Sequence, residues 1–214
     1  EDRTRQVRDL SLAVFGRVPK RVAFPGGKTR SAFIADMGDL QAVFAQRDSK
    51  EDAQLEGIVL KALHKTGLVP ALHSVAGEWV VQDFIAGERL PVRLHRTDDD
   101  GEREALMEGA LHSLVTLQEA AHSGALQHRV PRIGTADRWL WNRTGAAKRI
   151  SGKAGITPPD LDREKLVTAM TVKRDEFVNW DARPRNAMVK QYATMWIDWE
   201  DCGRSKALDD LAYL

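Results

Sequence analysis

Three oxygen-bearing side chains late in the chain have the types and spacing that phosphoryl transfer requires. Asn186 follows Asp181 by five residues, and the apolar stretch 195–197 then leads to Asp198. Transfer from a nucleotide needs a carboxylate that orients the attacking hydroxyl and accepts its proton. It also needs amide and carboxylate oxygens that hold magnesium against the phosphates. The segment therefore predicts a metal–phosphate site; the alternative is a plain polar turn, in which aspartate and asparagine are common.

Three motifs in this region resemble those of a known enzyme family. The segment 179–186, NWDARPRN, resembles the H-x-D-x-x-x-x-N catalytic loop of protein kinases and their small-molecule relatives. The segment 197–201, IDWED, is similar to the metal-binding I-D-W/F-E/G of the aminoglycoside phosphotransferases. The segment 208–212, LDDLA, is similar to the D-L-A helix start of that family. The three motifs follow one another in the family's order, which makes them more specific together than singly.

The resemblance implies a role for each matching residue. Asp181 is expected to be the catalytic base or hydroxyl orienter, and Asn186 and Asp198 are expected to be the ligands of Mg2+. Asp210 is expected to support the loop. One position departs from the pattern, because Asn179 stands where the family has a histidine of mainly architectural role.

The same loop carries two arginines whose role the sequence leaves open. Arg183 and Arg185 are expected either to neutralise phosphate charge or to hold the loop. An activation segment ending in A-P-E does not follow Asp198, so transfer to a small molecule is favoured over transfer to a protein.

A glycine turn early in the chain is a candidate phosphate-covering loop. Gly26 and Gly27 lie between two predicted strands, and glycine lets backbone amides approach phosphates closely. A Walker-type loop is excluded, because Val22 occupies its first glycine position and a strand rather than a helix follows. The alternative is an ordinary hairpin turn.

The third predicted strand resembles the V-A-x-K strand of kinase-like proteins. Ala45 is expected to lie over the purine base, and Arg47 stands where the family has a phosphate-binding lysine. The two residues share one face of the strand because side chains alternate along it. Arginine keeps the charge but is larger, planar and forked. Glu56 matches the glutamate that pairs with this cation; a solvated helical glutamate is the alternative.

The resemblance also implies a two-lobed, protein-kinase-like α+β fold. A small antiparallel sheet with one helix is expected to form a nucleotide-binding lobe over residues 1–86, and a mainly helical catalytic lobe is expected over residues 87–214. Family members carry further helices beyond this point, so the second lobe is expected to be short or incomplete at its end. The hinge, whose backbone receives the base, is matched by Gln82, Asp83, Phe84 and Ile85.

Local patterns predict the elements of these lobes. Turn residues, alternating apolar positions and helical spacing decide each boundary. The predicted strands are 21–24, 31–35, 40–47, a hairpin within 73–85, 177–178, 187–189 and 195–197. The predicted helices are 51–66, 102–122, 160–173 and one beginning at 205, while residues 127–159 give no clear pattern.

Composition narrows the setting of the protein. The 214 residues carry 32 lysines and arginines against 31 aspartates and glutamates, so the net charge of +1 gives no reason to expect a nucleic-acid or membrane partner. A single cysteine fits a cytoplasmic setting. The sequence leaves the oligomeric state open.

The expected activity is therefore a Mg2+-dependent phosphotransferase. It would move the γ-phosphate of ATP or GTP to a hydroxyl of a small-molecule acceptor. The alternative is a weakly active or inactive kinase-like protein that binds nucleotide, since Arg47 and Asn179 depart from the family pattern.

Overall fold

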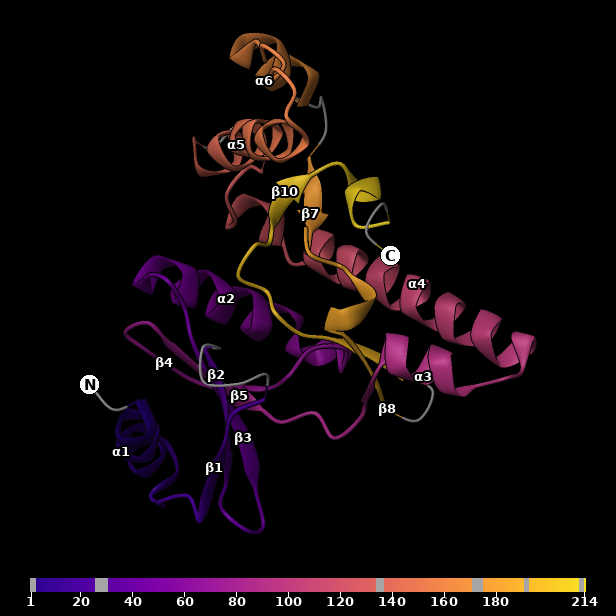
Figure 1. The fold of residues 1–214 in the computed structure, drawn as a ribbon. Helices are drawn as coiled ribbons and strands as arrows, with labels where there is room; N and C mark the ends of the chain where they lie inside the picture. The colour runs from indigo at the N-terminus through magenta and orange to yellow at the C-terminus, as the bar shows by residue number, and fades with distance from the viewer. Residues whose placement is uncertain (1–2, 26–30, 134–136, 171–174, 191–192, 212–213) are drawn as a thin grey trace.

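The chain folds into a five-stranded antiparallel sheet followed by a mainly helical part with short strands (Figure 1). The structure is a computed structural model that describes residues 3–25, 31–133, 137–170, 175–190, 193–211 and 214. Its helices are α1 (Arg3–Phe15), α2 (Lys50–Leu63), α3 (Leu90–Arg96), α4 (Asp100–Ser123), α5 (Asp137–Ala154) and α6 (Arg163–Met170). Its strands are β1 (Arg21–Ala23), β2 (Ala32–Asp36), β3 (Gln41–Gln46), β4 (Leu72–Ala76), β5 (Trp79–Asp83), β6 (Glu88–Arg89), β7 (Glu176–Val178), β8 (Ala187–Lys190), β9 (Ala193–Trp196) and β10 (Gly203–Ser205). Single 3-10 turns are η1 (His64–Thr66), η2 (Leu126–His128), η3 (Pro184–Asn186) and η4 (Ala207–Asp209).

The five-stranded sheet presents a different apolar surface on each face. Its strand order is β1–β2–β3–β5–β4, and every neighbouring pair is antiparallel. Phe33, Phe44 and Val81 point to one face and pack with Val7 of α1. Val80 points to the other face and joins the apolar cluster of α2 and α4. Because side chains alternate along a strand, α1 and α2 cover opposite faces of the sheet.

Helix α2 has well-defined ends and packs closely against the sheet in its middle. It begins at the N-cap Ser49, whose hydroxyl accepts the backbone N–H of Asp52 at 3.1 Å. It continues into η1 and stops where Gly67 adopts a left-handed φ of 69°. In the middle, a Cβ on Gly57 would come within 2.5 Å of the Val75 side chain, so glycine permits this close approach.

Strand β9 is anchored in the helical part through one tryptophan. Trp196 is fully buried; its indole N–H donates to Ser113 of α4 at 2.7 Å, and its backbone N–H donates to the Leu68 carbonyl at 2.8 Å. Strand β9 pairs with β8, and β8 with β6. Figure 1 shows α4 running along this part of the molecule. The residue two places after Trp196 is Asp198, so these bonds set where that carboxylate lies.

The observed elements confirm the α+β class and most of the predicted strands and helices. The three first strands, the helix from about residue 51, the hairpin and the long helix agree within two residues at nearly every boundary. Three helices went unpredicted: α1, α3 and α5. The helix expected from residue 205 was wrong within the described residues, where only the 3-10 turn η4 forms. In the described part of the chain, no helix is long and apolar enough to cross a bilayer.

Gly87 lies where the chain passes from the sheet to the helical part. Substituting it tests how closely the chain packs against β8 at this point. A Cβ there would come within 2.5 Å of the Val189 carbonyl oxygen, a backbone atom that cannot rotate away. We expect Gly87→Ala to lower the free energy of unfolding by about 1–3 kcal/mol, measured by urea titration. The control is Gly152→Ala in α5, where a Cβ meets nothing within 4 Å. Equal stability of the two variants would contradict the close approach at Gly87.

Candidate active site

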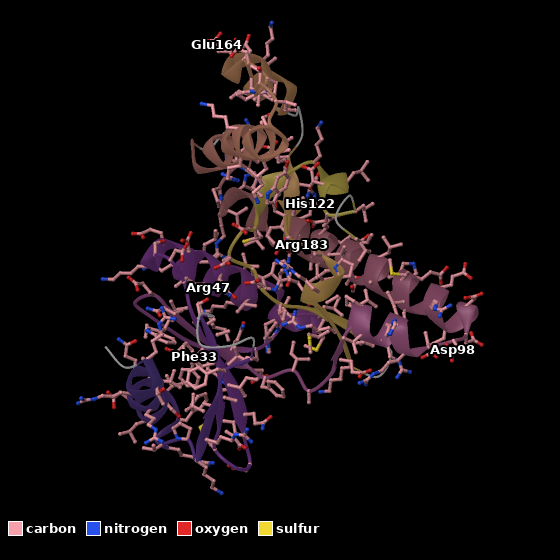
Figure 2. All side chains as sticks on the ribbon, viewed as in Figure 1. Phe33, Arg47, Asp98, His122, Glu164 and Arg183 are labelled. Carbon is pink, nitrogen blue, oxygen red and sulfur yellow. The ribbon has the colours of Figure 1, made fainter. Side chains whose placement is uncertain are left out.

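A cleft of about 480 Å³ lies between the five-stranded sheet and the segment that follows β7. It is lined on the sheet side by Val43, Ala45, Arg47 and Gln82 and on the opposite side by Asn186 and Asp198. Figure 2 labels Arg47 beside the sheet and α2, and Arg183 on the side of α4. Residues separated by about 150 positions therefore face one another across a single cavity.

Arg47 is the centre of a network of ion pairs in this cleft. Its Nε and Nη2 donate to the two carboxylate oxygens of Glu56 at 2.5 and 2.8 Å. Its Nη1 donates to Asp198 at 3.1 Å and to Glu200 at 3.0 Å. Glu56 is fully buried, and the Arg47 side chain is 6% exposed. A buried carboxylate needs such a partner, so the bidentate pair fixes Arg47 against α2.

The network changes the protonation of its members. Burial alone would lower the pKa of Arg47, but the charge and hydrogen bonds of Glu56, with the charges of Asp198 and Glu200, raise it above its usual range. Burial raises the pKa of Glu200 to about 7, against the lowering effect of Arg47 and with the neighbouring Asp198 adding to the rise. Arg47 therefore stays cationic, whereas Glu200 titrates near neutral pH.

The loop that carries Asp181 is held in place by Asp210. The two Asp210 carboxylate oxygens accept the backbone N–H groups of Asn179 at 2.9 Å and Trp180 at 2.8 Å. Trp180 has a φ of 66°, a conformation that costs a bulky side chain about 1–3 kcal/mol and persists only where neighbours hold it. The buried side chain of Asn179 accepts the N–H of Asp181 at 3.0 Å. Asn179 thus braces the loop, as does Asp210 in agreement with the sequence.

Asp181 is 8% exposed, and its carboxylate is enclosed by three donors. Arg183 forms an ion pair with Oδ1, Arg185 lies 3.9 Å from Oδ2, and the Asn186 amide donates to Oδ2 at 2.7 Å. The same Asn186 nitrogen donates to the Asp181 carbonyl at 3.0 Å. Because this nitrogen is committed to Asp181, the amide oxygen of Asn186 is directed away from that carboxylate.

Asn186 and Asp198 are brought together by a backbone hydrogen bond. The N–H of Ile197 donates to the carbonyl of Asn186 at 3.0 Å, and Asp198 follows in a left-handed conformation with φ 68°. In the described residues no group of three or more histidine, cysteine, aspartate or glutamate side chains could hold a metal by itself. Magnesium commonly takes one or two protein oxygens and completes its shell with phosphates and water. The donors present, one amide oxygen and one carboxylate, fit that ion.

The structure places five of the ten described site predictions in the lining of the cleft, and Asp181 contacts Asn186 without being part of that lining. Ala45, Arg47, Gln82, Asn186 and Asp198 all line the cleft, and the predicted Arg47–Glu56 pair forms, with Glu56 acting through Arg47. Of the predicted hinge residues that the structure describes, only Gln82 is part of the lining; the others are Asp83, Phe84 and Ile85. Asp83 instead pairs with His73 at 2.7 Å. Gly26 and Gly27 lie outside the described residues.

Two charged residues of the cleft lining had no predicted role. Glu200 stands in the quoted IDWED segment, and its type alone could have suggested a second acidic group beside Asp198. Arg89 lines the cleft from β6, and its guanidinium donates to the Arg185 carbonyl. Arg89 belongs to no motif, so only the three-dimensional arrangement identifies it.

Comparisons with known proteins agree with this arrangement. Residues 13–214 match the phosphotransferase enzyme family. The chain belongs to that family. No curated protein matches the chain in sequence.

Several solved structures have a similar fold, and one of them is a complex with a nucleotide and an aminoglycoside. A Ralstonia eutropha protein described as an aminoglycoside phosphotransferase has a TM-score of 0.69 at 14% identity, over 98% of this chain and 68% of its own. The streptomycin–ATP complex of APH(2″)-IIa has a TM-score of 0.62 at 16% identity, over 96% and 73%. A choline/ethanolamine kinase family protein from Mesorhizobium loti has a TM-score of 0.63 at 16% identity, over 99% and 69%. At these identities the likeness establishes the fold of this phosphotransferase-family chain.

The Arg47–Glu56 pair gives a direct test of the network. Glu56→Ala removes the carboxylate that bonds Arg47 bidentately and leaves a buried cation with fewer acceptors. We expect the free energy of unfolding to fall by about 3–5 kcal/mol, measured by urea titration. The control is Arg5→Ala, because the exposed pair Arg5–Asp9, 3.9 Å apart, contributes little. A Glu56→Ala variant as stable as the control would contradict the network.

Asp210 gives a pH-dependent test. Burial raises its pKa to about 6, although the N–H groups of Asn179 and Trp180 act to lower it. Since the folded state binds the proton more tightly than the unfolded chain, the stability that Asp210 contributes is present near pH 4 and is lost as the pH rises through 6. Asp210→Asn does not titrate, so between pH 4.5 and 7.5 the wild type should lose about 1–3 kcal/mol relative to this variant. If the difference in unfolding free energy between the wild type and Asp210→Asn stayed constant across that pH range, the raised pKa of Asp210 would be contradicted.

Proposed function

We propose that this chain transfers the γ-phosphoryl group of ATP or GTP to the hydroxyl of a small molecule, with Mg2+ required. The observation that carries the proposal is the arrangement of Arg47 and Asp198, 3.1 Å apart in a cleft that Asn186 also lines. A fixed cation beside two oxygen ligands is what a triphosphate with its metal needs. The family membership and the nucleotide-bound structures of similar fold support the same reading.

The nucleotide would bind with its base against the sheet. Val43 and Ala45 give an apolar wall for a purine ring, and Gln82 gives a polar edge beside it. The backbone of residues 82–85 would receive the base, and residues 26–27 would cover the phosphates. In this proposal residues 1–86 form the nucleotide-binding lobe and residues 87–214 the catalytic lobe.

The chemistry would depend on three groups with separate tasks. Asn186 and Asp198 would hold Mg2+, which when bound neutralises charge on the phosphates. Asp181 would orient the acceptor hydroxyl and accept its proton, since its loop is fixed by Asn179 and Asp210. Arg47, kept cationic by Glu56, would stabilise the phosphates.

The protein would act in the cytoplasm. Its one cysteine, Cys202, is a buried free thiol, which is consistent with a reducing compartment.

A second candidate function is nucleotide binding with little turnover. The observation that favours it is the engagement of Arg47, whose Nε, Nη1 and Nη2 already donate to three carboxylates. A lysine in that position could leave its ammonium free for the phosphates. Phosphoryl transfer measured in the wild type and in Asp181→Ala separates the two candidates, because only an active transferase loses turnover in the variant.

One substitution in the cleft and one in the loop beside it test the proposed function together. Asp198→Ala removes a carboxylate ligand, so Mg2+-dependent binding of ATP or GTP should weaken by about a hundredfold. Asp181→Ala should leave nucleotide affinity within about twofold and lower phosphoryl transfer by about 10²–10⁴. Nucleotide affinity is measured by calorimetry, and transfer by product detection over a panel of alcohols. Unchanged binding in Asp198→Ala would refute the metal assignment, and turnover that survives in Asp181→Ala would refute the base assignment.

A further inference from the structure

Charge is divided unequally between two ends of the cleft. At the end nearest α2, Arg47 is the one cation that pairs with the carboxylates of Glu56, Asp198 and Glu200 among the residues that the structure describes. One positive charge against three negative charges leaves a formal charge of −2 when all are ionised. This end suits a divalent cation and, with it, the triphosphate.

The opposite end carries a formal charge of the other sign. Around Asp181 lie the guanidinium groups of Arg183 and Arg185, and Arg89 donates to the Arg185 carbonyl. Three positive charges against one negative charge leave +2. The side chains of Arg183 and Arg185 are 42% and 54% exposed, so their remaining N–H donors can reach a ligand.

Other acidic groups near these arginines do not cancel that charge. Glu88, next to Arg89, forms an ion pair with Arg96. Glu102 of α4 forms one with Arg93 at 2.5 Å. Each of these carboxylates thus has an arginine of its own on α3. With Asp210 counted as well, because it binds the backbone of the same loop, three positive charges beside Asp181 still exceed two negative ones.

We propose that the acceptor of this phosphotransferase is an anion, a hydroxyl compound carrying a carboxylate or phosphate group that Arg183, Arg185 and Arg89 bind. The inference rests on the proposed function, because a hydroxyl that gives its proton to Asp181 must approach within hydrogen-bond distance of that carboxylate. Any such molecule lies next to the arginines. Guanidinium groups bind carboxylate and phosphate through paired hydrogen bonds, and they repel protonated amines.

The transfer step is the same as for a neutral alcohol. The acceptor oxygen forms a bond to the γ-phosphorus while the bond from that phosphorus to the bridging oxygen of the nucleoside diphosphate breaks. The hydroxyl proton passes to the Asp181 carboxylate, and the diphosphate leaves with the bridging electron pair. The acceptor's own anionic group takes no part in this step and stays on the arginines.

The test uses four probes that share one six-carbon chain of hydroxyls. D-gluconate and D-glucitol 6-phosphate are anionic, D-glucitol is neutral, and D-glucamine is cationic. Each is titrated by calorimetry into the protein loaded with Mg2+ and a non-hydrolysable ATP analogue, and again into the protein without nucleotide. We expect at least one anion to bind about tenfold or more tighter than D-glucamine, the size of one charged hydrogen bond. The two anions separate a carboxylate acceptor from a phosphate acceptor.

Charge reversal identifies the arginines responsible. Arg185→Glu should lower anion affinity at least tenfold, and Arg185→Lys should restore most of it, both measured without nucleotide. The control is Arg5→Glu on α1, which makes the same change of charge at an exposed side chain far from the cleft. Binding of D-glucamine as tight as that of the anions, absence of binding by all four probes, or an unchanged preference in Arg185→Glu overturns the proposal. If the protein fails to bind nucleotide, that result counts against the proposed function. The anion titrations without nucleotide then still test the proposal of an anionic acceptor.

Discussion

The ion pairs of Arg47, the buried residue directly after strand β3, are the interactions on which the rest of the site depends. Arg47 bonds Glu56 nine residues away and Asp198 and Glu200 more than 150 residues away. It thereby joins the sheet, helix α2 and the segment that carries Asp198 and Glu200. A charge this deeply enclosed is stable only with partners of good geometry, so each of these elements must occupy its place for the others to do so.

A second buried carboxylate, that of Asp210, holds the loop of Asp181 in place, as Glu56 holds Arg47. Asp210 accepts two backbone N–H groups of the loop and so holds Trp180 in a left-handed conformation that tryptophan rarely adopts. The loop in turn presents Asp181 next to Asn186. The site is therefore assembled from short segments whose positions come from buried polar contacts, and the apolar clusters beneath them supply the rigidity.

Much of this arrangement could be predicted from the sequence, because local signals coincide with chemistry. Turn glycines, strand alternation and the D-x-x-x-x-N spacing identified the sheet, helix α2 and the loop of Asp181. Arg89 could not be found, since its role comes from a fold that brings β6 beside η3. Helix α1 was missed although Val7, Leu10 and Val14 stand at helical spacing and pack on the sheet face that the helix covers.

The central claim is that Asn186 and Asp198 hold a metal ion opposite Arg47. The most direct measurement is the anomalous diffraction of Mn2+ in crystals grown with a non-hydrolysable nucleotide. The account predicts one strong peak at coordination distance from the Asp198 carboxylate and the Asn186 amide oxygen, with phosphate oxygens completing the shell. A peak bound elsewhere, with these two side chains uncoordinated and the nucleotide outside the cleft, would contradict it.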